Sequence, residues 1–416
     1  MAPLPLIACR HCDHLHQRLP IPAGALAACK RCGHVLYRQS GLPLRDWIAI
    51  VLAALLVFII ANCFPVVQLT MQGMTVRATL PQALWTTWGQ GHELVAAMTA
   101  LFALALPLGQ IVFLFWALRA VSRRRLPPDF RFGMRVLHAM TAWSMVPVLM
   151  LAILVAIVKL ADLAVLHVDA GLWAFAACTV LLTMLGRVTA LRVWRYAEDE
   201  RLVEVSGSGA DLGGLVAGCQ ACGFVQNLPR GGHGAPCGRC GARVHQRKPA
   251  SFSRAWALIA AAAILYIPAN VLPVMHIRTP AGTTSHTILG GVMEFWQTGS
   301  WDLALIVFVA SVVVPMTKLL ALAVLMLRSR WDGPAVQRQR TRLYELVEFI
   351  GQWSMLDVFV VVLLSAMADF PGFSQITAGP GAAAFGMVVI LTMFAAMSYD
   401  PRLGWDAAPA PKEYAE

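Results

Sequence analysis

Long apolar runs separated by short polar segments dominate the chain. Each run is long enough, or nearly long enough, to cross a lipid bilayer as a helix, which takes about 20 residues. The eight predicted spans cover residues 47–69, 92–118, 136–161, 172–194, 254–275, 301–327, 346–368 and 381–398. A chain of 416 residues with 58% hydrophobic and only 13% charged residues is also unlike a soluble domain. The pattern therefore predicts an α-helical polytopic membrane protein.

The charges between these runs predict the orientation of the chain. Arginines are concentrated in two loops, at 119–135 and 328–342, whereas the alternate loops at 70–91, 276–300 and 370–380 each carry at most one arginine or lysine. Basic loops remain in the cytoplasm, so both termini and the central cysteine-rich segment are predicted to be cytoplasmic. The net charge of +11 is explained by these loops. We therefore expect no nucleic-acid partner.

The sequence also contains a tandem repeat. An Ala-Asn-x-x-Pro-Val motif at 61–66 recurs at 269–274, and Trp-Ser-Met at 143–145 recurs at 353–355. Each half has an even number of spans, so both halves insert in the same orientation, as parallel repeats do. The predicted segments are a first head (1–40), a first membrane module of four helices (41–197), a linker (198–215), a second head (216–250), a second module of four helices (251–398) and a cytoplasmic tail (399–416).

The repeated Asn-x-x-Pro element lies near the outer end of the first and fifth spans. Proline removes a backbone donor and bends a helix, so Pro65 and Pro273 predict a bend in these spans. The amides of Asn62 and Asn270 could satisfy a freed backbone group. We interpret the element as a helix bend rather than a ligand site.

Eight of the ten cysteines form four Cys-x-x-Cys pairs. Sixteen residues separate the pairs of the first head and fourteen separate those of the second. Two pairs at this distance are typical of a zinc-ribbon-like fold with a tetrahedral structural zinc site. Glycine follows the second cysteine in three pairs, and Asp13 takes this place in the first, so that turn is expected to be less ideal. The two predicted sites are formed by Cys9, Cys12, Cys29 and Cys32, and by Cys219, Cys222, Cys237 and Cys240.

Two opposite charges occur deep in predicted spans of the second half. Lys318 lies nine residues before the predicted helix end at Leu327, which is about 14 Å along the helix. Asp357 lies eleven residues into the next span, at a similar depth from the same side. A charge inside a membrane marks a functional site by default, so the pair is a candidate transport site; a structural ion pair is the alternative. The first half has Gln110 and Pro147 at the matching positions, which favours one central site.

Other polar residues of the predicted spans could extend this pair into a polar track. Singly, each hydroxyl would be expected to serve helix packing, and the charges at the outer end of the third span could anchor it at the interface. These candidates are Lys159, Asp162, Ser311, Ser354 and Thr392.

Taken together, the two four-cysteine heads, the two four-span modules, the repeated motifs and the late Ser-Tyr-Asp-Pro-Arg at 398–402 make the chain resemble the paraquat-inducible protein A family of bacterial inner-membrane proteins. The resemblance implies a multi-pass inner-membrane subunit of an intermembrane lipid transport system. Such a subunit is expected to pass phospholipid to or from a periplasmic MCE-domain tunnel protein, to support envelope integrity and not to be an enzyme.

Two other functions remain open from the sequence. The heads could dock a cytoplasmic partner while the spans only anchor a scaffold or regulator. The Cys-x-x-Cys pairs could belong to a membrane thiol oxidoreductase, although that activity needs only one pair and usually a βαβ context. The chain contains no G-x-x-x-x-G-K-[ST] motif for nucleotide binding.

Overall fold

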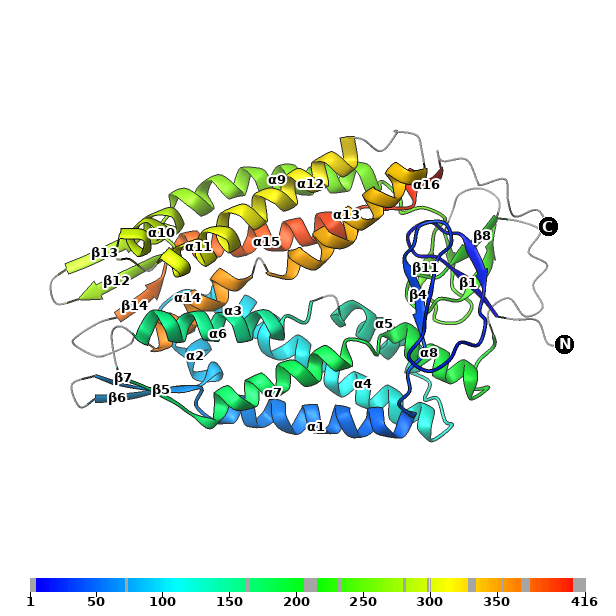
Figure 1. The fold of residues 1–416 in the computed structure, drawn as a ribbon, viewed down its shortest axis with the longest axis horizontal. Helices are drawn as coiled ribbons and strands as arrows, with labels where there is room; N and C mark the ends of the chain where they lie inside the picture. Colours follow the sequence, from blue (N-terminus) through cyan, green and yellow to red (C-terminus); the bar gives the residue numbers. More distant parts are fainter. Residues whose placement is uncertain are drawn as a thin grey trace.

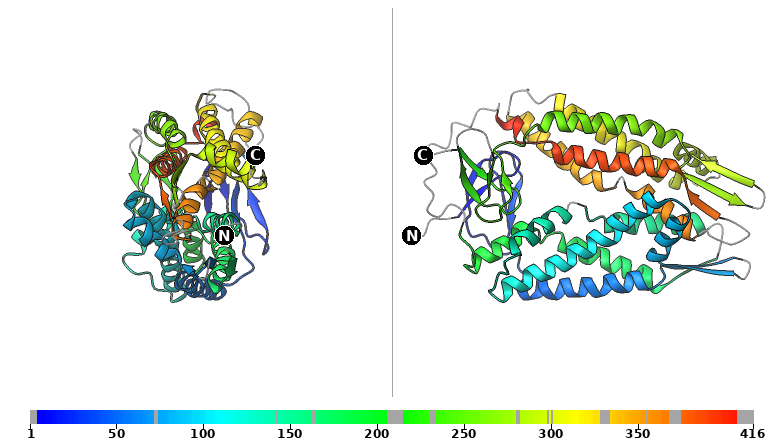
Figure 2. Two further views of the ribbon diagram at one scale, coloured as in Figure 1. Left: turned by 90° about the vertical axis from the view of Figure 1, so that its left-hand side faces the viewer. Right: turned by 180° about the vertical axis from the view of Figure 1, so that it is seen from behind.

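The two halves of the chain form two layers of helices, and the cysteine-rich heads lie together at one end of both layers (Figure 1). In this computed structural model the described residues are 5–71, 74–141, 143–161, 165–205, 215–229, 234–279, 282–297, 299, 301–327, 334–353, 355–367 and 375–406. Seen from behind, the same division holds, with the heads at one end of the helices and small sheets at the other (Figure 2).

The first module is built mainly from long apolar helices joined by short turns. Its second long helix contains a π-helical segment, η1, just before Pro107. The helical elements are α1 (Leu44–Cys63), α2 (Leu80–Gly89), α3 (Glu93–Thr99), η1 (Ala100–Ala105), α4 (Leu106–Ser122), α5 (Phe130–Thr141), α6 (Val146–Ala161), α7 (Ala170–Leu185) and α8 (Ala190–Asp199).

The second module repeats this order of elements. A second π-helical segment, η2, again lies just before a proline, Pro315. The elements are α9 (Ser251–Val271), α10 (Ile288–Gln297), α11 (Trp301–Phe308), η2 (Val309–Val313), α12 (Val314–Leu327), α13 (Pro334–Trp353), α14 (Leu356–Met367), α15 (Pro380–Ser398) and the short α16 (Leu403–Asp406). The structure thus confirms the predicted tandem repeat.

Among the described residues, six helical stretches are long and apolar enough to cross a membrane, and one of them, Phe130–Val158, joins α5 and α6 across their interruption. The six are Leu44–Cys63, Glu93–Ser122, Phe130–Val158, Ser251–Val271, Ala304–Leu327 and Pro380–Asp406. The bent pair α7 and α8, with an angle of 53°, would make seven. These agree with seven of the eight predicted spans. The remaining prediction, 346–368, falls on the end of α13 and on α14, and residue 354 between them lies outside the described residues.

The repeated Trp-Ser-Met motif coincides with an interruption of helical structure that the sequence did not predict. In the first module α5 ends at Thr141 and α6 begins at Val146, and in the second α13 ends at Trp353 and α14 begins at Leu356. Asp357 is therefore the second residue of α14, and not eleven residues into a continuous helix as predicted. At the first interruption, the ring of Trp143 stacks on Phe102 of its own module and makes a tilted contact with Phe394 of the other.

A three-stranded antiparallel sheet closes each module at the end away from the heads (Figure 1). In the first module the order is β6-β5-β7, so that Leu69 pairs with Val76 on one side and Leu166 on the other. The second module repeats this pattern with β13-β12-β14. The strands are β5 (Val67–Met71), β6 (Met74–Ala78), β7 (Val165–Val168), β12 (Met275–Thr279), β13 (Gly282–His286) and β14 (Gln375–Ala378).

The Asn-x-x-Pro element ends its helix and does not bend it, so the predicted helix bend is wrong. In the first module α1 ends at Cys63, before Pro65, because proline cannot continue the helical hydrogen bonding. The carbonyl of Pro65 then accepts a hydrogen bond of 3.0 Å from the backbone N–H of Gly171, at the start of α7. The amide of Asn62 donates to the carbonyl of Phe58 at 2.8 Å. The second module makes the same bonds between Gly381 and Pro273 and between Asn270 and Tyr266.

The two modules share one hydrophobic core along α14. This helix packs against α2, α3 and α6 of the first module. The contact includes one polar link, a hydrogen bond of 3.0 Å between the buried hydroxyls of Thr87 and Ser365.

Candidate functional site

Each head consists of two small hairpins, and each hairpin presents one Cys-x-x-Cys pair at its end. The four short strands of a head form almost no hydrophobic core of their own. The cysteines are instead buried in hydrophobic clusters that they share with residues of the membrane modules. The strands of the first head are β1 (Leu6–Ala8), β2 (Leu15–Gln17), β3 (Leu26–Ala28) and β4 (Val35–Arg38), and those of the second are β8 (Leu215–Gly218), β9 (Val225–Leu228), β10 (Ala235–Pro236) and β11 (Arg243–Val244).

The four sulfurs of each head converge on one point. In the first head Cys9 and Cys32 lie 3.5 Å apart, as do Cys12 and Cys29. The corresponding distances in the second head are 3.6 Å. Four thiolates about 2.3 Å from a central zinc ion form a tetrahedron with edges of about 3.8 Å. Thiolates this close repel one another unless a cation lies between them, so the donor set of each head fits a metal ion.

The turn after each cysteine pair takes the left-handed backbone conformation. The φ angles are 83°, 75° and 72° at Gly33, Gly223 and Gly241, and Asp13 adopts the same conformation with φ 60°. Aspartate tolerates this region better than most side chains. The four turns are therefore equivalent, and the aspartate does not distort the first one as expected from the sequence.

Each head packs its cysteines against the membrane module of the opposite half. Trp405, on the short helix α16 of the second module, packs with the four cysteines of the first head. Arg31, between two of these cysteines, lies over the Trp405 ring at 5.2 Å and donates to its carbonyl at 2.9 Å. Arg338 of α13 donates to the Arg31 carbonyl, also at 2.9 Å.

The second head makes the equivalent contact with the first module. Its cysteines share a hydrophobic cluster with Trp194 of α8 and Phe130 of α5. Arg239, at the position equivalent to Arg31, lies over the Trp194 ring at 5.7 Å and pairs with the carboxylate of Glu198. The heads are therefore exchanged between the halves. This exchange is not visible in the sequence.

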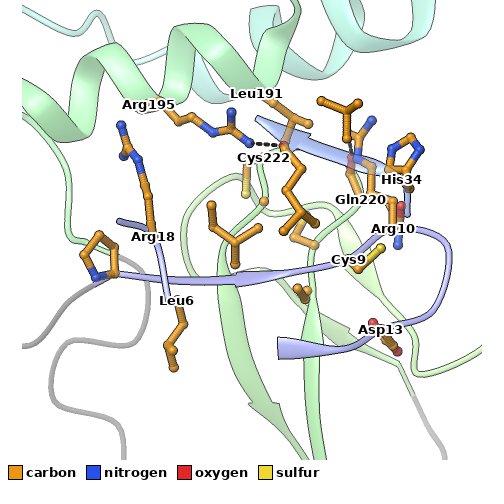
Figure 3. Close-up of a pocket in the computed structure, with 18 of the residues that line it drawn as sticks. Leu6, Cys9, Arg10, Asp13, Arg18, His34, Leu191, Arg195, Gln220 and Cys222 are labelled. Atoms are coloured by element: carbon orange, nitrogen blue, oxygen red, sulfur yellow. Dashed lines mark hydrogen bonds between the residues drawn. The ribbon is translucent and has the colours of Figure 1, made fainter. Parts of the chain in front are cut away.

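The heads also meet each other across a cleft that residues of both heads and of α8 line, shown in Figure 3. The arginines that line the cleft are used for contacts within the protein. Arg18 pairs with Glu198 at 3.1 Å, Arg195 donates to the Leu36 carbonyl at 3.0 Å, and Arg10 donates to the Gln220 carbonyl. The cleft is thus an interface that joins the two heads and α8.

Lys318 is buried in the second module, as the sequence predicts. Its side chain is 1% exposed, and its ammonium group has no hydrogen-bond partner among the described residues. It lies against the end of α13, since a Cβ atom added at Gly351 would be 3.0 Å from Lys318 Nζ. The helix α12 continues for nine residues to Leu327, as expected.

Two of the predicted hydroxyls are also buried in this module. Ser311 lies seven residues before Lys318 on the same long helix and donates to the Val307 carbonyl at 2.7 Å. Thr392 lies on α15, one residue before Met393, which would contact the same added Cβ atom at Gly351. In the first module Gln110 takes the place of Lys318 and is likewise buried.

The remaining predicted residues fall outside the described part of the structure. The backbone of Lys159 belongs to α6 and that of Asp357 to α14, but neither side chain is described, and the same holds for the whole of Asp162 and Ser354. The pairing of Lys318 with Asp357 thus stays a prediction.

A mostly apolar cavity lies near the sheet of the second module. Val155 of the first module lines it together with Val307, Val360 and Leu364 of the second, so the cavity lies between the modules. Ser311 is one of its few polar lining residues. The sequence did not predict this cavity, because its walls come from helices far apart in the chain.

Comparison with known proteins agrees with the repeat and with the two modules. The family model for Paraquat-inducible protein A matches residues 44–198 and 252–409, which are the two membrane modules without their heads. The chain belongs to this family. The matched segments begin at equivalent helices, α1 and α9. No solved structure matches the chain.

Several relatives are similar over nearly their whole length. The chain is 31% identical to the intermembrane transport protein PqiA of Escherichia coli, covering 97% of this chain and 96% of that protein. It is 29% identical to the lipophilic envelope-spanning tunnel protein A of the same organism, covering 96% and 91%. A probable intermembrane transport protein of Haemophilus influenzae is 26% identical, covering 97% and 96%.

Proposed function

We propose that this protein is the inner-membrane subunit of an intermembrane lipid transport system, and that it passes phospholipid to or from a periplasmic MCE-domain tunnel. The relatives named for intermembrane transport support transport between membranes. The observation that carries the lipid assignment is the cavity between the modules, because its mostly apolar walls with a few polar residues suit a lipid chain.

The buried polar residues supply the second part of the proposal. Ser311 connects the cavity to Lys318, which lies two helical turns further along the same helix. An ammonium group in a membrane interior is costly and marks a site that handles charge. We assign Lys318 and Thr392, together with the predicted Asp357 and Ser354, to a polar track that either binds the phosphate headgroup or carries a proton coupled to its movement.

The orientation follows from the positive loops. With the heads in the cytoplasm, the sheets and the cavity lie at the periplasmic side, where a tunnel protein could dock. Reduced cytoplasmic thiols and the four-sulfur geometry favour zinc as the structural ion of both heads. This assignment leaves the heads no open coordination position, and therefore no catalytic role.

The test combines lipid capture with two matched tryptophan variants. Val361 lines the cavity and is 6% exposed, whereas Leu320 faces outward on α12 and is 63% exposed. The proposal predicts that purified protein carries phospholipid detectable by mass spectrometry, and that Val361→Trp loses it while Leu320→Trp keeps it. In cells lacking their own family members, only Leu320→Trp should restore resistance to envelope stress.

A contrary result would be equally clear. If both variants carry the same lipid as the wild type and both restore resistance, the cavity does not hold the transported molecule. If cytoplasmic proteins rather than a periplasmic tunnel protein co-purify with the chain, the scaffold function is favoured. That function needs a free surface on the heads, and the cysteine-bearing side of each head is already covered by Trp405 or Trp194.

A further inference from the structure

A third group of metal-ligating side chains lies at the contact between the first head and α13. His11 stands between two cysteines of the first head, and His34 follows the last of them. Their rings are 4.0 Å apart between centroids. Glu345 of α13 approaches from the membrane module, with its Oε1 2.6 Å from His34 Nδ1. One ligand atom from each of the three residues lies within 4.8 Å of the other two.

His11 has a nitrogen with no partner in this group. Its side chain is 8% exposed, and its Nδ1 atom is buried without a hydrogen bond to any described residue. A buried polar atom is nearly always satisfied by a protein group, a water molecule or an ion. The imidazole of His11 lies against the ring of His34 and makes an edge contact with Tyr344. An unsatisfied nitrogen in this position is explained if it is a metal ligand.

The repeat shows that this group is not part of the four-cysteine fold. In the second head the positions of His11 and His34 are occupied by Ala221 and Ala242. The second head holds its cysteines in the same geometry without these imidazoles. The first module has Arg135 in place of Glu345. Each of the three ligands is therefore missing from the matching position of the other half, although both heads dock on a module.

We propose that His11, His34 and Glu345 bind a divalent transition-metal ion of the zinc type, at a site separate from both four-cysteine clusters. Two imidazoles and one carboxylate are a ligand set typical of zinc, and three protein ligands leave one coordination position open. Nitrogen and oxygen ligands about 2.0–2.2 Å from the ion would be separated by about 3.3–3.6 Å. The present separations, from 2.6 Å to at most 4.8 Å, bracket that range.

Such an ion would fasten the first head to the helix that touches Lys318. Glu345 lies six residues before Gly351, whose backbone packs against Lys318 Nζ. The site would thus join the cytoplasmic head to the polar interior of the second module. With an open position and no thiolate, it is expected to release its ion more readily than the four-cysteine sites.

The experiment measures metal bound to the full-length protein in detergent. Metal content per chain is determined at saturating free Zn²⁺, and Co²⁺ loading is followed by absorbance, because only thiolate sites give sulfur-to-cobalt charge transfer. Glu345→Gln removes one ligand without changing either head. His34→Gln removes a second ligand, and His14→Gln is a matched control in the same head, since His14 contacts His16 and not the site.

The proposal predicts one ion more than the two four-cysteine clusters can hold, bound without charge-transfer absorbance. Glu345→Gln should lower the affinity for this ion by at least about tenfold while both thiolate signals remain. His14→Gln should leave this affinity unchanged. The proposal is overturned if the wild type binds no ion beyond the thiolate sites, or if Glu345→Gln keeps the extra ion. If His34→Gln also loses a thiolate signal, this variant has disturbed the first head itself. The result of Glu345→Gln then decides whether the site exists, because Glu345 lies outside the head.

Discussion

The carboxylate of Asp13, in the first turn of the chain's first head, lies 3.4 Å from the guanidinium of Arg402, which is 389 residues further along the sequence. The same carboxylate pairs with Arg247 at 2.6 Å. The hydrogen bonds that Arg247 donates to Asp406 and to Asp13 raise the pKa of its guanidinium. Asp13, which occupies the position of glycine in the other three turns, therefore links the first head to the segment that follows the second head and to the segment that follows α15.

Replacing Asp13 by glycine separates its role in the left-handed turn from its role in the ion pairs with Arg247 and Arg402. Glycine suits the left-handed turn, so Asp13→Gly should leave the metal content unchanged. The loss of two charged hydrogen bonds to partly buried arginines should lower stability by about 1–3 kcal/mol, measured as a lower thermal midpoint in detergent. The control Glu200→Gln removes an exposed ion pair with Arg124 and should change stability by at most about 1 kcal/mol. Equal effects of the two variants would contradict this role.

The metal content of the heads can be tested by removing one pair of cysteines. The double variant Cys219→Ser/Cys222→Ser should lose one thiolate-bound ion per chain and destabilise the second head, because small metal-held folds depend on their ion. Elemental analysis should identify the ion as zinc. Cys178→Ser, a buried cysteine inside a helix, should leave the metal content unchanged. An iron-type visible spectrum, or the absence of metal from the wild type, would exclude zinc.

The docking of α7 on the end of α1 predicts an effect of a single methyl group. A Cβ atom at Gly171 would collide with the Pro65 carbonyl oxygen, and at the repeated Gly381 it would lie 2.6 Å from the Leu272 oxygen. Gly171→Ala and Gly381→Ala should each destabilise the protein by about 1–3 kcal/mol. Gly291→Ala, in α10 with open space around the added atom, should be neutral or stabilising by about 1 kcal/mol. Thermal unfolding of the three variants measures the difference.

The role of the intramembrane charges is decided by comparing single and double variants. A charge alone in the membrane costs about 2.5–3.5 kcal/mol on insertion scales. Lys318→Ala and Asp357→Ala should each abolish complementation of an envelope-stress phenotype at normal protein abundance. Gln110→Ala, at the matching position of the first module, should remain active.

The double variant Lys318→Leu/Asp357→Leu completes this test. A purely structural ion pair can often be replaced by apolar residues without loss of stability. A stable but inactive Leu/Leu protein would show that the charges themselves are needed for transport. Full activity of this variant would mean that the pair only holds the helices together.

Reporter fusions can test the orientation of the two modules. The positive loops predict a cytoplasmic signal for a reporter after Arg125 and a periplasmic signal near Gly282, in the sheet of the second module. A reporter in the linker at Ser208 should read cytoplasmic. A periplasmic reading there would exclude the eight-span arrangement and the parallel repeat with it.

Much of the fold could be predicted from the sequence because it depends on local patterns. Apolar runs give the helices, the spacing of the cysteines gives the heads, and the recurrence of motifs gives two modules. The burial of Lys318 follows from its place in an apolar run. In each case the signal lies within about 30 residues of the chain, where hydrophobic periodicity and ligand spacing are informative.

Features that depend on distant pairing could not be predicted. The strand at 165–168 pairs with that at 67–71, and neither is long enough to be distinguished from a loop. The exchange of heads requires Arg31 to meet Trp405, which nothing local indicates. The cluster of His11, His34 and Glu345 depends on that exchange, because its third ligand comes from the opposite half.

The exchange of heads also has an evolutionary consequence. A duplicated gene first encodes two equal halves, and an ancestral half on its own would have left the cysteine-bearing side of its head without its present docking surface. Two copies could satisfy each other by swapping heads, which is the arrangement of a domain-swapped dimer. Fusion of the copies would turn this exchange into contacts within one chain, such as that between Arg239 and Trp194. The halves were then free to diverge, and the ammonium group of Lys318 is present in only one of them.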